Sequence, residues 1–168
     1  MKPFRFCPGC GNQLGDPNRD GASHCERCNR SWYRNAAPTA GAAIVADGRA
    51  LVTTRAREPE KGRVDIVGGF LHFDENPIDG LKREAKEEIG VDIDVSNADF
   101  VQAIPHAYGP EGDWVLALGF KARLVSGEPT PADDVAAVQW VTLAELDDLD
   151  WAWPHDRDLV RKALIDER

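Results

Sequence analysis

The segment from residue 76 to residue 90 carries both the start and the stop signals of one amphipathic helix, and it constrains the fold more than any other segment. Asn76 suits an N-cap, Pro77 suits the first helical position, and Gly90 suits the residue just beyond the last turn. Apolar side chains recur at helical spacing at Ile78, Leu81, Ala85 and Ile89. We therefore predict a helix from Pro77 to Ile89 that packs this stripe against a sheet.

Three glutamates gather beside the apolar stripe, on an arc of the helix about 100° wide. Glu84 meets Glu87 at i+3 and Glu88 at i+4, and each like-charge contact costs about 0.2–0.5 kcal/mol in an isolated helix. This arrangement favours a bound divalent cation, although an acidic solvated face without a ligand would also fit the charges alone. Arg83 can reach Glu87 at i+4 and orient it.

A glycine-rich loop precedes the helix. Gly68 and Gly69 let the backbone approach a metal or a phosphate closely, and Glu75 lies at the end of the loop just before the cap. Together with the gathered glutamates, this loop predicts a metal-dependent phosphate site.

For the rest of the main domain we predict strands with interspersed helices. Residues 39–46 and 49–55 flank Asp47-Gly48, a strong hairpin turn. Further strands are predicted at 63–67, 70–73, 100–104, 114–122 and 135–141, and further helices near Thr142 and from Pro154 to Ile165. This order predicts an α/β fold with helices packed against a mixed sheet.

The first 28 residues hold all the cysteines of the chain, in two C-x2-C pairs separated by fourteen residues: Cys7, Cys10, Cys25 and Cys28. This spacing predicts a structural Zn²⁺ site with four thiolates, and four unligated or disulfide-bonded cysteines are the alternative. So short a segment with little aliphatic content needs the metal to fold. We expect a zinc ribbon at 1–35 and a second domain at 36–168, joined near residues 34–38.

The net charge of the chain limits the classes of partner that it can bind. A net charge of -9 argues against a nucleic-acid duplex or an anionic membrane, because neither attracts an acidic surface. The chain shows neither a secretory signal nor an apolar run approaching the roughly 20 residues of a spanning helix. We therefore expect a cytoplasmic protein with a small-molecule partner, no membrane and no nucleic acid, and we leave homodimerisation open.

Residues 69–91 closely resemble the signature box of the Nudix hydrolases: Gly69-x5-Glu75-x7-Arg83-Glu84-Ala85-x-Glu87-Glu88-x-Gly90-Val91. The one departure is Ala85, where a larger aliphatic residue is usual. The resemblance implies an α/β/α sandwich with a mixed β-sheet, from about Thr39 to the end. It also implies hydrolysis of the pyrophosphate bond of a nucleoside diphosphate linked to another moiety.

The same resemblance implies roles for the box residues. Glu84, Glu87 and Glu88 would ligate Mg²⁺ or Mn²⁺ together with a backbone carbonyl near Gly69, and Arg83 would hold the glutamates in place. Glu84 is our first choice for the group that takes the proton of the attacking water. Acids of the later loops are alternative bases or additional ligands, at Glu111, Asp113, Asp133 and Asp134.

A zinc ribbon ahead of a Nudix domain is similar to the NADH pyrophosphatase branch, which makes NAD(H) or ADP-ribose a natural substrate. The Ser-Gln-Pro-Trp-Pro-Phe-Pro-like run of that branch is here reduced to Gln102-Ala-Ile-Pro105. Tyr108 could stack on a base, and Arg55 and Glu75 could contact the substrate. Two alternatives stay open: a nucleoside triphosphate pyrophosphatase and a non-catalytic nucleotide-sensing module.

Overall fold

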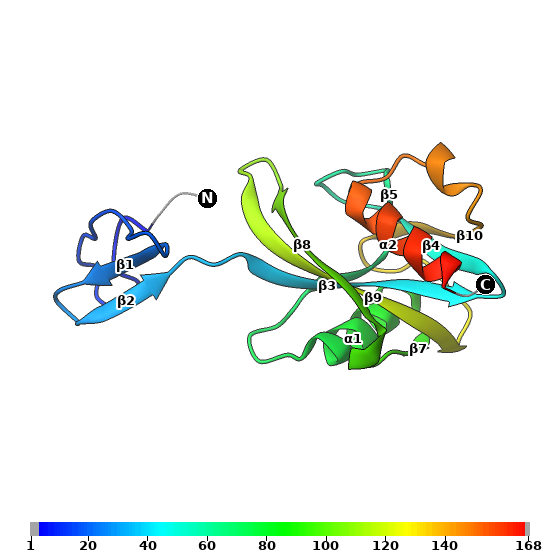
Figure 1. Cartoon of the computed structure of the whole chain (residues 1–168), viewed down its shortest axis with the longest axis horizontal. Helices are drawn as coiled ribbons and strands as arrows, with labels where there is room; N and C mark the ends of the chain where they lie inside the picture. Colours follow the sequence, from blue (N-terminus) through cyan, green and yellow to red (C-terminus); the bar gives the residue numbers. More distant parts are fainter. Residues whose placement is uncertain (1–3, 167–168) are drawn as a thin grey trace.

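The structure, a computed structural model, describes residues 4–166 and has two parts (Figure 1). The amino-terminal module contains an antiparallel hairpin of β1 (Ala22–Cys25) and β2 (Arg30–Tyr33). It stands beside the main body and joins it through the start of β3 (Ala37–Ala46). None of the helices within residues 4–166 has the length and hydropathy of a membrane span.

β3 organises the sheet of the main body because it has different partners along its two edges. One edge pairs in parallel with β9 (Asp113–Ser126). The other edge pairs first with β6 (Val67–Phe70) and then, beyond residue 42, with β4 (Arg49–Arg55), both antiparallel. This change of partner separates β6 from β4.

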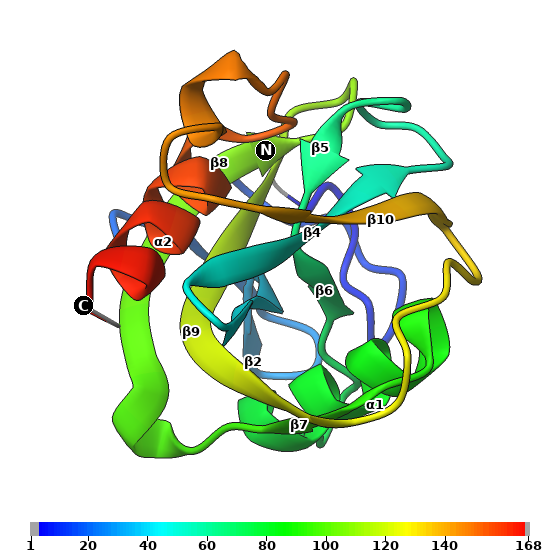
Figure 2. The ribbon, with the colours of Figure 1, turned by 90° about the vertical axis from the view of Figure 1, so that its right-hand side faces the viewer.

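The remaining strands extend the sheet on both sides. β5 (Val64–Asp65) and β10 (Val135–Val141) pair with β4, and β10 lies beside it across the sheet (Figure 2). β7 (Asp92–Asp94) and β8 (Phe100–Tyr108) pair with β9. All pairs except β3 with β9 are antiparallel, so the eight-stranded sheet is mixed as expected.

Two helices cover opposite faces of the sheet (Figure 1). The alternation of side chains along β3 shows this, since residues 40, 42 and 44 pack in one core cluster and residues 43 and 45 in another. The first cluster contains Leu81, Ala85 and Ile89 of α1 (Pro77–Ile89), and the second contains Leu159, Val160, Ala163 and Leu164 of α2 (Pro154–Ile165). The fold is therefore an α/β/α sandwich.

The predicted bounds of both long helices and of the strand at 135–141 are confirmed. The strand expected at 70–73 is wrong, because β6 ends at Phe70 and a turn follows. In that turn His72 N–H donates to the Glu75 carboxylate and Glu75 N–H donates to the His72 carbonyl. These local bonds replace the ladder of a strand.

The helix expected near Thr142 is also wrong. The segment contains turns and one short 3₁₀ helix, η2 (Leu146–Asp148); another, η1 (Asn97–Asp99), precedes β8. Thr142 donates from both its N–H and its hydroxyl to the Glu145 carboxylate, at 2.7 Å each. Trp151 Nε1 donates to the Leu146 carbonyl at 2.8 Å. These bonds hold a compact turn, and a longer helix would lose them.

Candidate active site

The caps and the apolar face of α1 determine where its glutamates point. The Asn76 side chain accepts a hydrogen bond from Ile78 N–H, and Gly90 ends the helix in the left-handed conformation. Leu81, Ala85 and Ile89 are fully buried against the sheet. Because Glu84 and Glu88 lie next to this stripe, they face β6 and its glycine pair.

Glu88 is the most buried carboxylate of the predicted box, with 6% of its surface exposed. Its Oε2 accepts a hydrogen bond from Gly68 N–H at 3.1 Å. Burial, with the nearby charge of Asp134, raises the pKa of Glu88 to about 9. Burial also raises the pKa of Glu84, although Arg83 opposes the shift. Negative charge at this site is therefore under-compensated by the chain itself.

The two glycines before the turn are required by close neighbours. Gly68 has a φ of +151°, and a Cβ on it would lie 2.2 Å from the Ala40 carbonyl oxygen. A Cβ on Gly69 would lie 2.3 Å from Glu84 Oε1. The first glycine thus lets β6 approach β3, and the second leaves room for a site carboxylate.

Arg83 holds the acids of the box together, as predicted for its pair with Glu87. Its five N–H groups make five hydrogen bonds, to Glu75 Oε1 and Oε2, Glu84 Oε1, Glu87 Oε2 and the Phe70 carbonyl. The bidentate pair with Glu75, at 2.8 Å for each bond, holds the pKa of Glu75 at about 2. Glu75 is thus a structural partner of Arg83 in this state.

The four loop acids end up in different places. The charge of Asp134 raises the pKa of both Glu84 and Glu88, so its carboxylate belongs to the same site. Asp133 instead pairs with Arg57 at 3.0 Å on the surface. Asp113 pairs with Arg34 at 3.1 Å, and Glu111 lies in the turn between β8 and β9.

Carboxylate oxygens suit a hard divalent cation, so the donor set of Glu84, Glu87, Glu88 and Asp134 fits Mg²⁺ or Mn²⁺. The raised pKa values of the buried members fit as well, because a cation would favour their ionised forms. In this structure Glu84 and Glu87 are turned toward Arg83. Among the described residues, only the four cysteines bring at least three ligand atoms within 4.8 Å of one another.

A cavity of about 130 Å³ opens beside the glutamates. Gly68, Gly69 and Asp134 form the wall toward the box. The other lining side chains include aromatic, histidine and acidic residues from distant parts of the chain: Asp65, Phe70, His106, Tyr108, Trp153, His155 and Asp156. Nothing in the local sequence around Asp65, His155 or Asp156 marks them as site residues, so we did not predict them.

Two of the three predicted substrate residues line this cavity. Arg55 donates to Asp65 at 2.7 Å and to the Pro59 carbonyl at 2.7 Å, so it is anchored in the wall. Tyr108 contacts Phe70 edge-on at 5.4 Å and lies nearly parallel to Trp153 at 5.7 Å between ring centroids. The third predicted residue, Glu75, is held by Arg83 and is absent from the residues that line the cavity.

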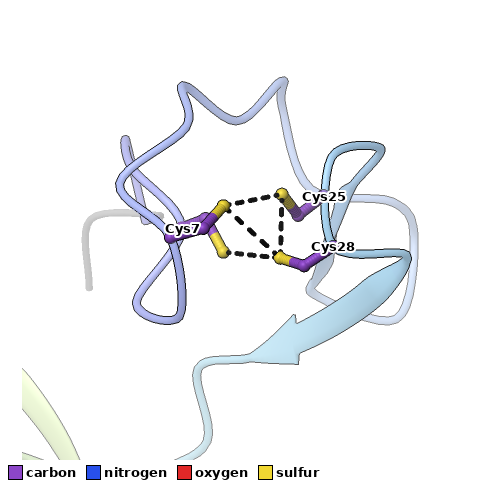
Figure 3. Close-up of side chains that lie close together, drawn as sticks. Cys7, Cys25 and Cys28 are labelled. Carbon is purple, nitrogen blue, oxygen red and sulfur yellow. Dashed lines mark hydrogen bonds between the residues drawn. The ribbon is translucent and has the colours of Figure 1, made fainter.

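The four cysteines converge in the amino-terminal module, and Figure 3 shows sulfur atoms of the cluster turned toward one another. Their closest separations are 3.3–3.6 Å. A disulfide would require about 2.05 Å, whereas tetrahedral Zn–S bonds of about 2.3 Å place sulfurs about 3.8 Å apart. All four are free thiols in this structure, so the cluster could hold a zinc ion.

Comparisons with known proteins agree with this geometry. A family model described as the NUDIX domain matches residues 36–163. The protein named NAD-capped RNA hydrolase NudC of Pseudomonas aeruginosa is 29% identical over 167 residues, covering 96% of this chain and 54% of that protein. The chain thus spans about half the length of this relative.

A putative 8-oxo-dGTP diphosphatase 2 of Mycobacterium tuberculosis is 37% identical over 123 residues, covering 68% of this chain and 79% of that protein. The crystal structure of a NUDIX hydrolase from Nitrosomonas europaea shares the fold with a TM-score of 0.76 at 21% identity. That match covers 97% of this chain and 92% of the other. The chain belongs to the Nudix hydrolase family.

Proposed function

We propose that this chain hydrolyses the pyrophosphate bond of a nucleoside diphosphate linked to a second moiety, with Mg²⁺ or Mn²⁺ as cofactor. The observation that carries the proposal is the gathering of Glu84, Glu87, Glu88 and Asp134 beside one cavity. Those glutamates and a backbone carbonyl near Gly69 would hold the metal. When bound, the metal lowers the pKa of a coordinated water and neutralises charge on the phosphoryl oxygens.

Residues around the metal site have separate roles in binding the substrate and in moving a proton. Gly68 and Gly69 expose backbone on their part of the wall, so that a phosphate can approach it. Arg83 orients Glu84 and Glu87 through its NH1 group. We assign Glu84 as the acceptor of the proton of the attacking water, because its carboxylate lies against Gly69 in the wall of the cavity, among the acids that would hold the metal. Asp134 is the alternative acceptor.

The cavity supports a substrate with an aromatic ring next to its pyrophosphate. Phe70, Tyr108 and Trp153 offer ring faces and edges on which a heterocycle can stack. The name of the NudC relative refers to NAD-capped RNA, so we propose an NAD-derived dinucleotide or ADP-ribose as the substrate class. A dinucleotide joined to RNA also belongs to this class, and the expectation from net charge that nucleic acid plays no part stays a prediction that the substrate panel tests.

A second candidate is a nucleoside triphosphate pyrophosphatase. The printed name of the Mycobacterium tuberculosis relative, a putative 8-oxo-dGTP diphosphatase, favours it. A third candidate is a nucleotide sensor without turnover. The complete set of box glutamates argues against it, because binding alone does not need them.

A substrate panel with product identification tests these candidates. The purified chain with Mg²⁺ is given NAD⁺, NADH, ADP-ribose, an NAD-capped oligonucleotide, dGTP and 8-oxo-dGTP, and products are identified by mass spectrometry. Two mononucleotide halves from the dinucleotides support the proposal, and release of pyrophosphate from triphosphates supports the second candidate. Binding without turnover of any compound contradicts both.

Variants tie the activity to the site. We expect Glu87→Gln and Glu88→Gln to lose nearly all turnover while keeping the fold, because an amide is a poor ligand for a hard cation. Glu128→Gln, an exposed glutamate in the loop after β9, is the matched control. Full activity in either box variant refutes the metal assignment.

We also propose that Cys7, Cys10, Cys25 and Cys28 bind a structural Zn²⁺, and that residues 1–35 form a zinc ribbon ahead of a catalytic domain at 36–168. The close approach of the four sulfurs supports this assignment. Zinc content measured by atomic emission, with Cys25→Ser as the variant, tests it. About one zinc per chain is the expected result, and a protein without zinc at full stability contradicts it.

A further inference from the structure

Two carboxyl groups that the proposed chemistry does not use lie buried against each other in the wall of the cavity. Asp65 of β5 and Asp156, in the first turn of α2, are each 8% exposed, and both line the cavity. Their carboxyl groups are in hydrogen-bonding contact. Two ionised carboxylates this close together and away from water would repel each other, so the pair requires either a second positive charge or a proton.

Asp65 is the ionised member of the pair, because donors already hold both of its oxygens. Oδ2 accepts a hydrogen bond from NH1 of Arg55 at 2.7 Å, and Oδ1 accepts one from Ile66 N–H at 2.8 Å. Burial raises the pKa of Asp65, and these two donors oppose that shift. A carboxylate oxygen has two lone pairs, so Asp65 can accept one more hydrogen bond, from Asp156.

The cavity offers no positive charge for Asp156. Arg55 is the one lysine or arginine among the residues that line the cavity, and Asp65 balances it. His155 Nε2 lies 3.6 Å from Asp156 Oδ1; burial and the repulsion of His106 hold the pKa of His155 at about 4, so its ring is neutral at pH 7. Burial and the charge of Asp65 raise the pKa of Asp156 well above its usual range. A proton on Asp156 therefore completes the pair.

The carboxyl pair matters for the cavity because it anchors Arg55. Nε of Arg55 donates to the Pro59 carbonyl at 2.7 Å, NH1 donates to Asp65, and the Tyr108 hydroxyl accepts from a third N–H. The guanidinium also lies 4.8 Å from the centroid of the Trp153 ring. Because a guanidinium has five N–H groups, two are left for a ligand in the cavity that Arg55 lines.

We propose that Asp65 and Asp156 share one proton and act as positioning residues for Arg55, which donates hydrogen bonds to the part of the substrate that enters the cavity. The hydroxyl of the Asp156 carboxyl group donates to the Asp65 carboxylate, and Asp65 in turn holds NH1 of Arg55. The three groups together are then neutral, so an acceptor on the ligand meets Arg55 without repulsion. This role of Arg55 rests on the proposed function, whereas the shared proton does not.

Infrared spectroscopy tests for the proton directly. A protonated carboxyl group has a C=O stretching band that a carboxylate lacks, so the wild-type spectrum at pH 7 minus that of Asp156→Asn should contain one such band. Subtraction cancels the contribution of other buried acids such as Glu88. Asp94→Asn, which removes a surface partner of Arg123, is the matched control and should give no such difference. Absence of the band from the Asp156 difference spectrum overturns the shared proton.

Steady-state kinetics with NAD⁺ and ADP-ribose test the positioning of Arg55. Asp65→Ala removes the anchor of NH1 and Asp156→Ala removes the donor to Asp65, so each should raise KM about 10-fold or more with little change in kcat. Asp156→Asn should keep KM within about threefold of wild type, because its amide N–H replaces the carboxyl O–H as donor. Wild-type KM in both alanine variants, or equal KM in Asp156→Asn and Asp156→Ala, overturns the positioning role.

Circular dichroism and thermal melting establish that each variant is folded. If the alanine variants do not fold, Arg55→Lys makes the same test, because lysine keeps the charge and loses the planar fork that Asp65 and the ligand would bind. It should raise KM in the same way, and a wild-type KM overturns the role of Arg55.

Failure of the proposed function would look different. If neither compound is hydrolysed, the infrared band still measures the shared proton, and calorimetric titration with ADP-ribose and Ca²⁺ compares the affinities of the same variants. Weaker binding by the alanine variants there keeps the role of Arg55 while the hydrolase proposal falls. Equal affinities, or no binding, overturn that role. Turnover with wild-type KM in every variant leaves the hydrolase proposal standing and overturns the positioning of Arg55.

Discussion

Gly69→Ala should lower activity strongly while leaving stability nearly unchanged. A Cβ at this position would lie 2.3 Å from Glu84 Oε1 and 2.7 Å from Glu84 Cδ, whereas ordinary contacts of a Cβ begin near 3.4 Å. The carboxylate must therefore retreat by about 1 Å. The backbone of Gly69 has no positive φ, so alanine causes no strain of its own.

The expected magnitudes follow from this geometry. A displacement of about 1 Å at a catalytic group can cost roughly 10²-fold in rate, so kcat should fall by about that factor. The Glu84 carboxylate is the end of a flexible side chain, so its movement should cost less than about 1 kcal/mol of unfolding free energy. Gly15→Ala is the matched control, because its Cβ would meet nothing within 4 Å and its φ is not positive.

The assay is steady-state turnover of the substrate found with the panel, as a function of Mg²⁺ concentration, together with thermal melting. The expected result is a large loss of kcat with a melting temperature within a few degrees of wild type. If kcat stays within threefold of wild type, the position of Glu84 does not matter for the reaction. If the melting temperature falls by much more than a few degrees, the backbone moves in place of the Glu84 side chain, which contradicts the expected result.

Three further outcomes are expected. Gly68→Ala should lower the free energy of unfolding by roughly 2–6 kcal/mol in denaturant titrations, from backbone strain and overpacking against β3, and clearly more than Gly62→Ala, which has positive φ but no clash. Removing zinc with a chelator should make residues 4–33 protease-sensitive in peptide mapping while the main body stays resistant. Arg83→Lys should move acid unfolding to higher pH. The pKa of Glu75 is about 2 when folded, so its ion pair stabilises fully above the unfolded pKa near 4.5 and is lost as pH falls toward 2; circular dichroism checks the shift.

The parts of the fold that were predictable are those with local signals. The bounds of α1 follow from Asn76, Pro77 and Gly90, which act within one turn of the helix ends. The residues after Thr142 also predict a helix, yet hydrogen bonds from Trp151 and to Glu145 hold the segment as a turn. Such bonds depend on where the chain lies in the fold, so composition over a short window does not reveal them.

The candidate site divides in the same way. Glu84, Glu87 and Glu88 share one helix, so their spacing alone brought them onto one arc. The convergence of the four cysteine sulfurs was likewise predicted from spacing, because each pair lies in one tight turn. Which of the loop acids joins the glutamates could not be predicted from neighbouring residues; the structure selects Asp134.

The reactive groups of this protein are visible in its residue order: a carboxylate helix that follows a glycine pair, and two pairs of cysteines. The surroundings of these groups depend on how whole strands and helices pack. Asp65 on β5 and Asp156 on α2 lie against each other. Their contact depends on the change of partner strand along β3 and on the packing of α2 against one face of the sheet. Residues so far apart in the chain carry no shared periodicity, and contact between them depends on the packing of whole elements.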